Sequence, residues 1–283
     1  MILRTEDDFS LERIAESGQC FRWERTGEGG YRIPVGEHCL YIAPLGAGEF
    51  ALDCSETLFG EFWRSYFDLD ADYRSIRERI GVEDPFLAGA ARAEKGIRIL
   101  RQDPWEVTVS FIISQNRNIP AIRRSVELLC RAAGERRTDG RGREFWIFPS
   151  PEAILALSEE ALDGCRLGYR AKYVRAAAEA AASGALRLDE LPDAGEEDSM
   201  AALTALYGVG PKVASCIALY GLHHLNAFPV DTWVRRILEN EYPAGYPSER
   251  YSPYNGVYQQ YMFACYRHRA GAATDRETPP ALP

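Results

Sequence analysis

Short apolar or aromatic runs occupy the first part of the chain, up to about Asp53. These runs are Cys20–Trp23, Tyr31–Val35 and Cys39–Ile42, and glycine-containing segments at 27–30 and 36–38 separate them. Glycine-rich turns between such runs are typical of β-hairpins. The pattern predicts a small antiparallel sheet. Pro34 favours an edge strand, because proline has no N–H to donate to a strand ladder.

From about Ser55 the apolar spacing changes to the three-to-four residue period of a helix, as in the segment Leu58–Tyr66. Asp103-Pro104 and Ser150-Pro151 each place a capping side chain before a proline, which is a common helix start. Val107–Cys130 reads as apolar helical segments interrupted near 114–120. These signals predict a helical body of about 200 residues.

The predicted fold class is therefore α+β, with a small N-terminal antiparallel β domain and a mostly α-helical body. We place a β-rich domain at residues 1–80 and a helical domain at 81–270. Residues 271–283 are rich in Pro, Ala and Thr and are expected to form a flexible tail.

Composition sets wide limits on function. The 283 residues are 46% hydrophobic, which is enough for a sizeable core. No apolar run reaches the about 18 residues of a membrane span, and the first residues lack an apolar signal core, so we expect a cytosolic protein. The seven cysteines are scattered without a CxxC pair, which argues against a zinc site and a disulfide framework.

Charge alone does not indicate a nucleic-acid enzyme, because the formal net charge is −9. Basic residues nevertheless gather at 117–131, 136–143 and 166–175. They form either ordinary solvated faces or a basic face that suits DNA, since net charge says little about the local field. The aspartates of Tyr66–Tyr73 suggest a calcium loop, but the glycine and glutamate of such a loop are missing, so we interpret the segment as structural.

The segment Leu206–Ala214 carries the first chemical signal. Gly208 and Gly210 permit positive φ and close approach to a ligand, and Pro211 suits the first position of a helix. Backbone N–H groups at such a helix start bind phosphate. An ordinary glycine turn between two helices would look the same, so the turn alone is weak evidence.

Lys212 follows this turn, in the first turn of the predicted helix. The helix dipole and partial burial are both expected to disfavour its ammonium form, and a neutral amine is a nucleophile. Cys216 lies four residues on, so it shares a helix face with Lys212. Asp231 precedes Thr232-Trp233 and suits a helix N-cap. A surface lysine, a buried cysteine and a simple cap are the alternative interpretations.

Together, Leu206–Ala214 and Phe228–Trp233 resemble the lysine-nucleophile branch of the helix-hairpin-helix DNA glycosylases, and specifically the 8-oxoguanine DNA glycosylase/lyase family. The resemblance extends from Ser17 to about Arg267. It implies that Lys212 attacks the sugar and that Asp231 stabilises positive charge developing there. It also implies that Cys216 lies against the flipped base, where a Lys–Cys pair of opposite charge would complement the oxidised purine.

Two further segments resemble the base pocket of that family. Ser17–Trp23 is similar to its N-terminal element, which implies that the Gly18 carbonyl accepts a hydrogen bond from N7–H of 8-oxoguanine. Gly256–Phe263 is similar to the pocket helix, which implies that Gln259 contacts the Watson–Crick edge and Phe263 stacks on the base. A turn glycine and a core phenylalanine are the alternatives.

The remaining similarities concern contacts with the duplex around the gap that the flipped base leaves. Asn116 aligns with the residue that fills the gap of the flipped base, Tyr169 with a wedge in the stack, and Arg170 with a contact to the orphaned base. A polar loop and a solvated Arg/Lys turn are the alternatives. The chain departs from the family pattern at Arg117, Ala121 and Trp233, where relatives carry Asn, Arg and His.

The resemblance implies excision of 8-oxoguanine from duplex DNA by a bifunctional glycosylase with AP lyase activity, acting through a lysine Schiff base. We expect a monomer, because flipping one nucleotide needs only one site. It implies no organic or metal cofactor, although a structural monovalent cation at the hairpin carbonyls is compatible with it. Only Cys265 follows Cys216, so a four-cysteine iron–sulfur cluster is not expected. A glycosylase for formamidopyrimidine lesions and a non-catalytic DNA-binding protein remain as alternatives.

Overall fold

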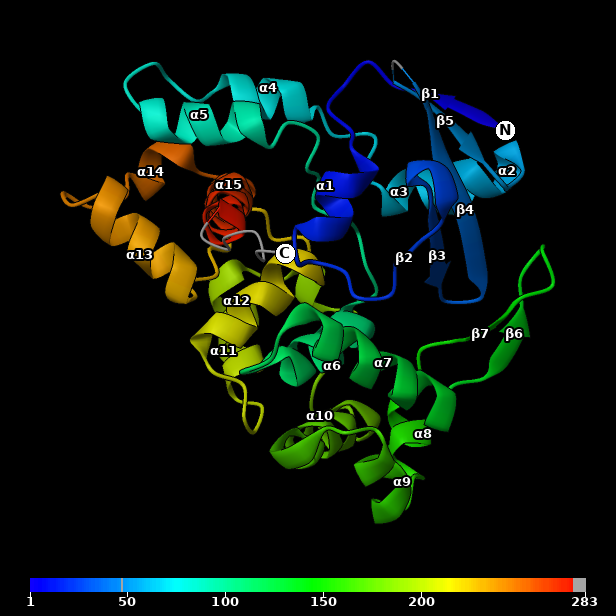
Figure 1. Ribbon diagram of the computed structural model, residues 1–283. Helices are drawn as coiled ribbons and strands as arrows, with labels where there is room; N and C mark the ends of the chain where they lie inside the picture. Colours follow the sequence, from blue (N-terminus) through cyan, green and yellow to red (C-terminus); the bar gives the residue numbers. More distant parts are fainter. Residues whose placement is uncertain (47, 277–283) are drawn as a thin grey trace, which may run out of the picture.

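The computed structural model describes residues 1–46 and 48–276 and contains a sheet beside a larger helical body (Figure 1). The sheet is antiparallel and five-stranded, in the order β1-β5-β4-β3-β2. Its strands are β1 (Ile2–Arg4), β2 (Glu24–Arg25), β3 (Tyr31–Val35), β4 (His38–Gly46) and β5 (Glu49–Leu52). The predicted α+β class is confirmed.

Helices make up most of the remainder. The helices in the first part of the chain are α1 (Leu11–Glu16), α2 (Glu56–Leu58), α3 (Arg64–Tyr66), α4 (Tyr73–Glu78), α5 (Pro85–Ala93), α6 (Pro104–Ser114), α7 (Ile119–Ala133), α8 (Pro151–Leu155) and α9 (Glu159–Gly164). The later ones are α10 (Ala171–Ala182), α11 (Glu196–Thr204), α12 (Pro211–Tyr220), α13 (Thr232–Glu241), α14 (Ser248–Tyr251) and α15 (Asn255–Arg276). A π-helical turn at Phe59–Trp63 joins α2 to α3, and short 3₁₀ turns lie at Gly27–Gly29, Gly168–Arg170 and Leu191–Asp193.

The hairpin prediction holds for two of the three apolar runs. Tyr31–Val35 is β3, and Cys39–Ile42 lies within β4. Pro34 pairs with Cys39 on one side only, because β2 pairs no further along β3 than Tyr31 and Arg32. Proline is therefore tolerated in a strand that is not at the formal edge of the sheet.

The prediction of a strand at Cys20–Trp23 is wrong. Cys20 and Trp23 pack into the core under the sheet, whereas Phe21 packs into the core of the helical body. The Arg22 guanidinium donates to the carbonyl of Trp146. Side chains in this segment thus serve two different cores, and the backbone joins the ladder only at Glu24–Arg25.

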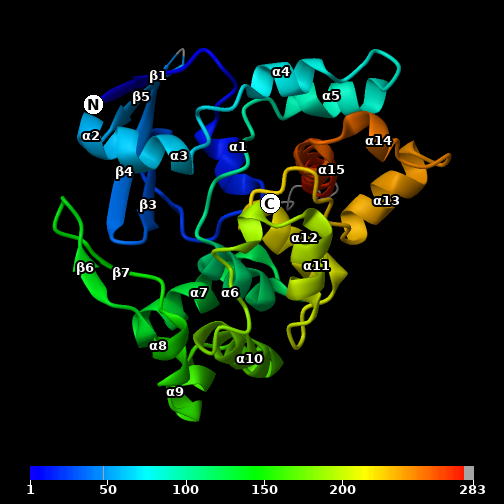
Figure 2. The same cartoon turned by 180° about the vertical axis from the view of Figure 1, so that it is seen from behind.

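A second antiparallel pair, β6 (Arg136–Thr138) and β7 (Glu144–Trp146), lies beside the sheet in both views (Figures 1 and 2). A buried ion pair attaches this hairpin to the sheet. Arg32 Nε lies 2.8 Å from Asp139 Oδ2, with side-chain exposures of 2% and 0%. A buried pair of this kind is strongly destabilising when broken, so it fixes the hairpin to the sheet.

The aspartate-rich segment is structural, as expected. Asp68 is buried, accepts a hydrogen bond from Tyr73 Oη and pairs with Arg101 and His223. Asp72 caps α4 through the amide of Ser75. Within residues 1–46 and 48–276 no cluster of three or more His, Cys, Asp or Glu side chains is arranged to hold a metal ion.

The predicted tail begins too early. Helix α15 extends to Arg276, so residues 271–276 are helical. Residues 277–283 lie outside the described part of the chain. The division at residue 80 stays a prediction; Phe67 belongs to the core under the sheet, and Tyr73 already belongs to the core of the body.

None of the helices described has both the length and the apolar character that crossing a membrane requires.

Candidate active site

A small pocket opens between the end of α1, helix α12 and helix α15. All six residues predicted to act on the sugar or the base contribute to its wall, namely Gly18, Lys212, Cys216, Asp231, Gln259 and Phe263. They come from segments separated by nearly the whole chain, which the fold brings together. The cavity volume is only about 60 Å³, far below the about 300 Å³ of an ordinary small-molecule site. The pocket must therefore widen to admit a purine.

Lys212 occupies the second position of α12, directly after Pro211. Its Nζ lies 5.8 Å from the centroid of the Phe111 ring, at the mouth of the pocket. The side chain is exposed, so the partial burial that we expected is absent. The start of α12, the Phe111 ring and the Cys216 thiol surround the amine, which therefore belongs to the pocket wall.

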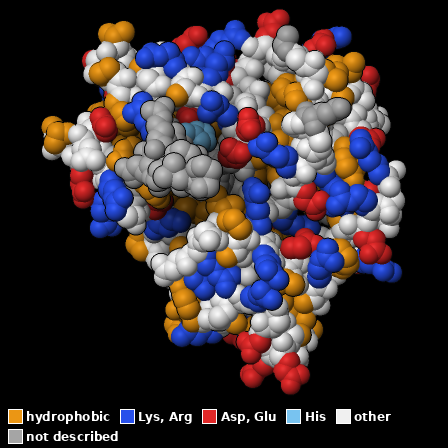
Figure 3. Space-filling view, viewed as in Figure 1, with side chains coloured by type: hydrophobic (Ala, Val, Ile, Leu, Met, Phe, Trp, Pro, Cys, Tyr) orange, Lys and Arg blue, Asp and Glu red, His pale blue; other side chains and the backbone are white. Residues whose placement is uncertain are grey.

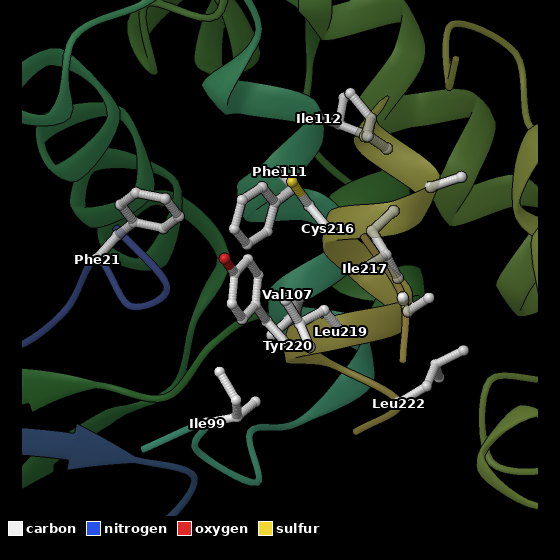
Figure 4. Packing of buried hydrophobic residues seen from close by; sticks show 14 of the residues in the cluster. Phe21, Ile99, Val107, Phe111, Ile112, Cys216, Ile217, Leu219, Tyr220 and Leu222 are labelled. Atoms are coloured by element: carbon white, nitrogen blue, oxygen red, sulfur yellow. The ribbon is translucent and has the colours of Figure 1, made fainter. Parts of the chain in front are cut away.

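Cys216 lies one turn further along α12, on the face shared with Lys212. Its sulfur sits beside the Phe111 ring, and the Tyr220 ring lies next to that ring (Figure 4). Phe111 and Tyr220 stack with centroids 5.3 Å apart. Burial raises the pKa of the Cys216 thiol, and Lys212 only partly opposes this shift. The thiol form is therefore favoured at neutral pH, and the Lys–Cys pair of opposite charge stays a prediction.

Asp231 is the N-cap of α13, as predicted. Its Oδ1 accepts a hydrogen bond of 2.8 Å from the amide of Val234. Because the cap bond fixes the side chain, the carboxylate is held at the pocket rather than free in solvent. Trp233, at the position where relatives carry His, packs edge to face against Tyr266, with centroids 6.0 Å apart.

Helix α15 supplies the wall opposite Cys216. Gln259 is buried, and its Nε2 donates to the carbonyl of Pro229 at 3.0 Å. Phe263, one turn later, is half-buried. Gly18 has φ of +84° and lies against Phe263, since a Cβ built on it would be 3.7 Å from that ring. A side chain at position 18 would be strained by its backbone conformation and would enter the pocket.

The hairpin needs glycine at position 208 for two reasons. Gly208 has φ of +84°, and a Cβ there would lie 2.3 Å from the ring of Tyr173. Gly210 is different: it caps α12 with φ of −94°, so the positive φ that we allowed for it is absent. No atom lies within 4 Å of a Cβ built on Gly210. That open space suits an approaching phosphate at a helix start.

Three tyrosines connect the predicted wedge to the hairpin. Tyr169 contacts Tyr173 with centroids 5.8 Å apart, and Tyr173 contacts Tyr207 with centroids 5.1 Å apart, both edge to face. Tyr169 and Tyr207 are 48% and 58% exposed, which is unusual for large aromatic side chains. The outer members of this chain are therefore available to DNA.

Asn116 lies beside the wedge. It is exposed, has φ of +51°, and its Nδ2 donates to Tyr169 Oη at 3.2 Å. Arg170 differs from expectation, because it is buried and its guanidinium donates to the carbonyls of Gln115, Asn116 and Leu167. In the free protein it holds the Asn116 turn in place and presents no free face to an orphaned base.

The cations around the pocket and the wedge have no carboxylate partners within ion-pair distance in the described part of the chain. They are Arg117, Arg123, Arg124, Arg166, Arg170, Lys172, Arg175, Lys212, Arg235, Arg236 and Arg267. Basic side chains gather over α6 and α7 on the face shown in Figure 3. The predicted segment 136–143 does not join them, since Arg141 and Arg143 pair with Asp53 and Glu24 beside the sheet.

The part of the chain that matches known protein families is nearly the same as the part that supplies the pocket residues. Residues 1–108 match the N-terminal domain of 8-oxoguanine DNA glycosylase, and residues 109–249 match the HhH-GPD superfamily of base excision DNA repair proteins. The chain belongs to the 8-oxoguanine DNA glycosylase family.

Individual relatives agree with this assignment. This glycosylase is 33% identical to the N-glycosylase/DNA lyase OGG1 of Arabidopsis thaliana over 252 residues, which cover 83% of this chain and 67% of the relative. It is 31% identical to the N-glycosylase/DNA lyase of Saccharomyces cerevisiae, covering 84% and 69%. The Clostridium acetobutylicum 8-oxoguanine glycosylase/lyase, in complex with DNA containing cytosine opposite 8-oxoguanine, superposes with a TM-score of 0.87 at 32% identity, covering 95% and 98%.

Sequence reasoning missed several pocket residues of this glycosylase. Phe111 and Tyr220 line the pocket, yet each belongs to an apolar helical stretch that looks like ordinary core. Gln115 was also missed, and its Nε2 donates to the carbonyl of Gly208 at 3.1 Å, joining the Asn116 turn to the hairpin. The only sequence signal for Gln115 was its position directly before Asn116.

Proposed function

We propose that this protein excises 8-oxoguanine from duplex DNA as a bifunctional glycosylase and AP lyase. The observation that carries the proposal is the convergence of Lys212 and Asp231 on one pocket with Gly18, Cys216, Gln259 and Phe263. Membership of the family supports the substrate, because the relatives are N-glycosylase/DNA lyases and 8-oxoguanine glycosylases.

In the proposed reaction, the duplex kinks at Tyr169 and the damaged nucleotide turns out of the stack. The Lys212 amine, in its neutral form, attacks C1′ of the sugar, and the C1′–N9 bond breaks as the base leaves with a proton. The Asp231 carboxylate stabilises the positive charge that develops on the sugar. The sugar ring of this adduct then opens. The C1′–O4′ bond breaks, O4′ takes up a proton to become a hydroxyl, and the lone pair of the Lys212 nitrogen forms the C1′=N bond of the Schiff base.

Strand cleavage follows from the same adduct. Loss of a proton from C2′ of the Schiff base expels the 3′ phosphate by β-elimination, so the strand is nicked 3′ to the lesion. Water then releases Lys212. The proton acceptors are the base and the Asp231 carboxylate, and no redox change occurs at any step.

Base recognition rests on three walls of the pocket. The Gly18 carbonyl would accept N7–H, which 8-oxoguanine has and guanine lacks. The Gln259 amide would face the Watson–Crick edge, and the base would stack between Phe263 and the neutral Cys216 thiol. Asn116 would fill the space that the flipped nucleotide leaves, while Arg170 supports the turn that carries Asn116.

A monovalent cation at the hairpin is a further part of the proposal. Carbonyl oxygens of the turn before Gly210 are the ligands that a hard cation prefers. The Gly208 carbonyl already accepts a bond from Gln115, which leaves its second lone pair for such an ion. Its contribution would be to rigidify the phosphate-binding turn. Melting in potassium and in choline salts of equal concentration measures this.

The decisive experiment is borohydride trapping on duplexes with one 8-oxoguanine opposite each of the four bases. A covalent adduct with the unaltered protein and none with Lys212→Gln is the expected result. Adducts opposite bases other than cytosine would reveal what Ala121 changes. Base release without any adduct would point to a water-driven glycosylase.

Two alternatives have distinct outcomes in the same assay. Faster trapping on formamidopyrimidine than on 8-oxoguanine duplexes would make ring-opened purines the main substrate. Binding of duplex DNA with neither an adduct nor base release would indicate a non-catalytic DNA-binding protein.

A further inference from the structure

One face of α15 leads from the floor of the pocket to its mouth. Gln259, Phe263 and Arg267 follow each other at intervals of four residues, so their side chains lie along the same face. Gln259 is buried, whereas Phe263 and Arg267 are half-buried. The first two line the pocket, and Arg267 lies just beyond Phe263.

Arg267 is held at this position by two contacts. Its Cζ lies 5.3 Å from the centroid of the Phe263 ring, which is a cation–π distance. Its Nη1 donates to the carbonyl of Glu16 at 3.2 Å, across the pocket mouth at the end of α1. The same Nη1 would lie 3.8 Å from a Cβ built on Gly18. The guanidinium therefore bridges both walls of the entrance.

The charge of Arg267 is not neutralised by an ion pair. No carboxylate of the described residues lies within 4.0 Å of it, and its other N–H groups have no partner among the described hydrogen bonds. Burial lowers the pKa of this guanidinium, and the nearby Glu16 and Asp231 carboxylates only partly oppose that shift. Arg267 is thus a partly desolvated cation beside the residue pair that would act on the sugar.

A flipped base enters the pocket while its own phosphates stay at the entrance, because the DNA backbone remains continuous. With C1′ beside Lys212 and Asp231, those phosphates must lie outside them, at the level of Phe263 and beyond. We propose that Arg267 binds a phosphodiester that flanks the flipped nucleotide, exchanging the Glu16 carbonyl for phosphate oxygen. This inference rests on the proposed function and adds a DNA-binding residue to it.

The test measures binding to a duplex with one tetrahydrofuran abasic analogue and to the same duplex undamaged, each over a range of salt concentrations. The analogue has no base, so base recognition does not affect the result. Arg267→Met and Arg267→Gln remove the charge, and glutamine keeps a donor for Glu16. Arg267→Lys keeps the charge. Arg92→Met, on α5 and away from the pocket, is the matched control.

On the abasic duplex, the slope of log K against log salt should fall by about 0.9 in both uncharged variants, as for one lost phosphate contact. Affinity at low salt should fall about tenfold. Arg267→Lys and Arg92→Met should retain the slope, and the undamaged duplex should show no difference between the proteins.

An unchanged slope for Arg267→Gln on the abasic duplex would overturn the inference and leave Arg267 as a support for Phe263. An equal loss on both duplexes would also overturn it, because the contact would not belong to a flipped nucleotide. If the unaltered protein did not prefer the abasic duplex, the proposed function itself would fail.

Discussion

The sheet region and the side of the helical body that carries the pocket and the wedge use arginine in opposite ways. Arginines of the sheet region are mostly tied to carboxylates, as in Arg25 with Glu12 and Glu16, or Arg32 with Asp139. Around the pocket, Arg124 and Lys172 have no such partner among the described residues. The first group holds the fold together, and the second provides free positive charge.

This difference explains how a protein with a net charge of −9 can bind DNA. Paired arginines contribute little field beyond their partners, whereas unpaired ones act at a distance. The relevant quantity is the charge that remains after internal pairing, on one face. The predictions below test that division, from the largest expected effect to the smallest.

Asp231→Asn should separate the catalytic carboxylate from the helix cap. Asparagine caps a helix as well as aspartate does, so the melting temperature should stay unchanged. The rate of base release should fall about 100- to 1,000-fold, because the charge facing the sugar is lost. Single-turnover excision measures this. Asp103→Asn, the N-cap of α6, is the matched control and should leave the rate unchanged. Equal losses in both variants would make Asp231 only a cap.

Arg32→Met should destabilise the sheet region without affecting DNA binding. It leaves the buried Asp139 carboxylate without its cation, which costs about 3–5 kcal/mol in the free energy of unfolding. Urea unfolding gives the value. Arg64→Met, which breaks an exposed pair with Asp70, is the control and should cost below about 1 kcal/mol. Similar values for the two variants would contradict the distinction between buried and exposed pairing.

The Asp68 carboxyl should make stability depend on acidity. His223 and Arg101 lower its pKa to about 2 against the desolvation that opposes them, from the ordinary 3.8. Its contribution is present above about pH 4 and disappears as the pH falls towards 2, which is worth about 2 kcal/mol. Unfolding free energies between pH 5 and pH 2 should therefore fall less steeply for Asp68→Asn. Parallel curves for the two proteins would show that the Asp68 carboxyl does not contribute to the pH dependence of stability.

Arg124→Met should have the smallest effect, and only on DNA. Arg124 is exposed on α7 and unpaired, so unfolding should hardly change. The salt slope of binding to undamaged duplex should fall by about 0.9, as for one phosphate contact. Arg64→Met serves again as the control, because its paired charge lies in the sheet region. A lower slope for Arg64→Met would break the comparison.

Much of this arrangement follows from local rules that the sequence displays. Asp103, Ser150 and Asp231 each cap a helix through the predicted side chain, because capping depends on neighbouring residues only. The glycine hairpin before Lys212 has the same origin. The resemblance to the family also brought together pocket residues from four segments, which periodicity alone could not have done.

The errors come from contacts between distant segments. Cys20–Trp23 looks like a strand, but its side chains divide between two cores. Arg170 was expected to contact the orphaned base, but in the free protein it is buried and donates to the carbonyls of the Asn116 turn. Lys212 was expected to be partly buried but is exposed. Its exposure depends on how the surrounding helices pack around the pocket. Such outcomes depend on tertiary packing, which no short window of sequence contains.

The contact between Gly208 and Tyr173 has a mechanical consequence. Because the ring of Tyr173 fills the place of a side chain at 208 and also touches Tyr169, the wedge and the phosphate grip share one rigid support. In the proposed complex, the contacts that Tyr169 and the hairpin make with DNA would keep a constant spacing, because both rest on the same ring.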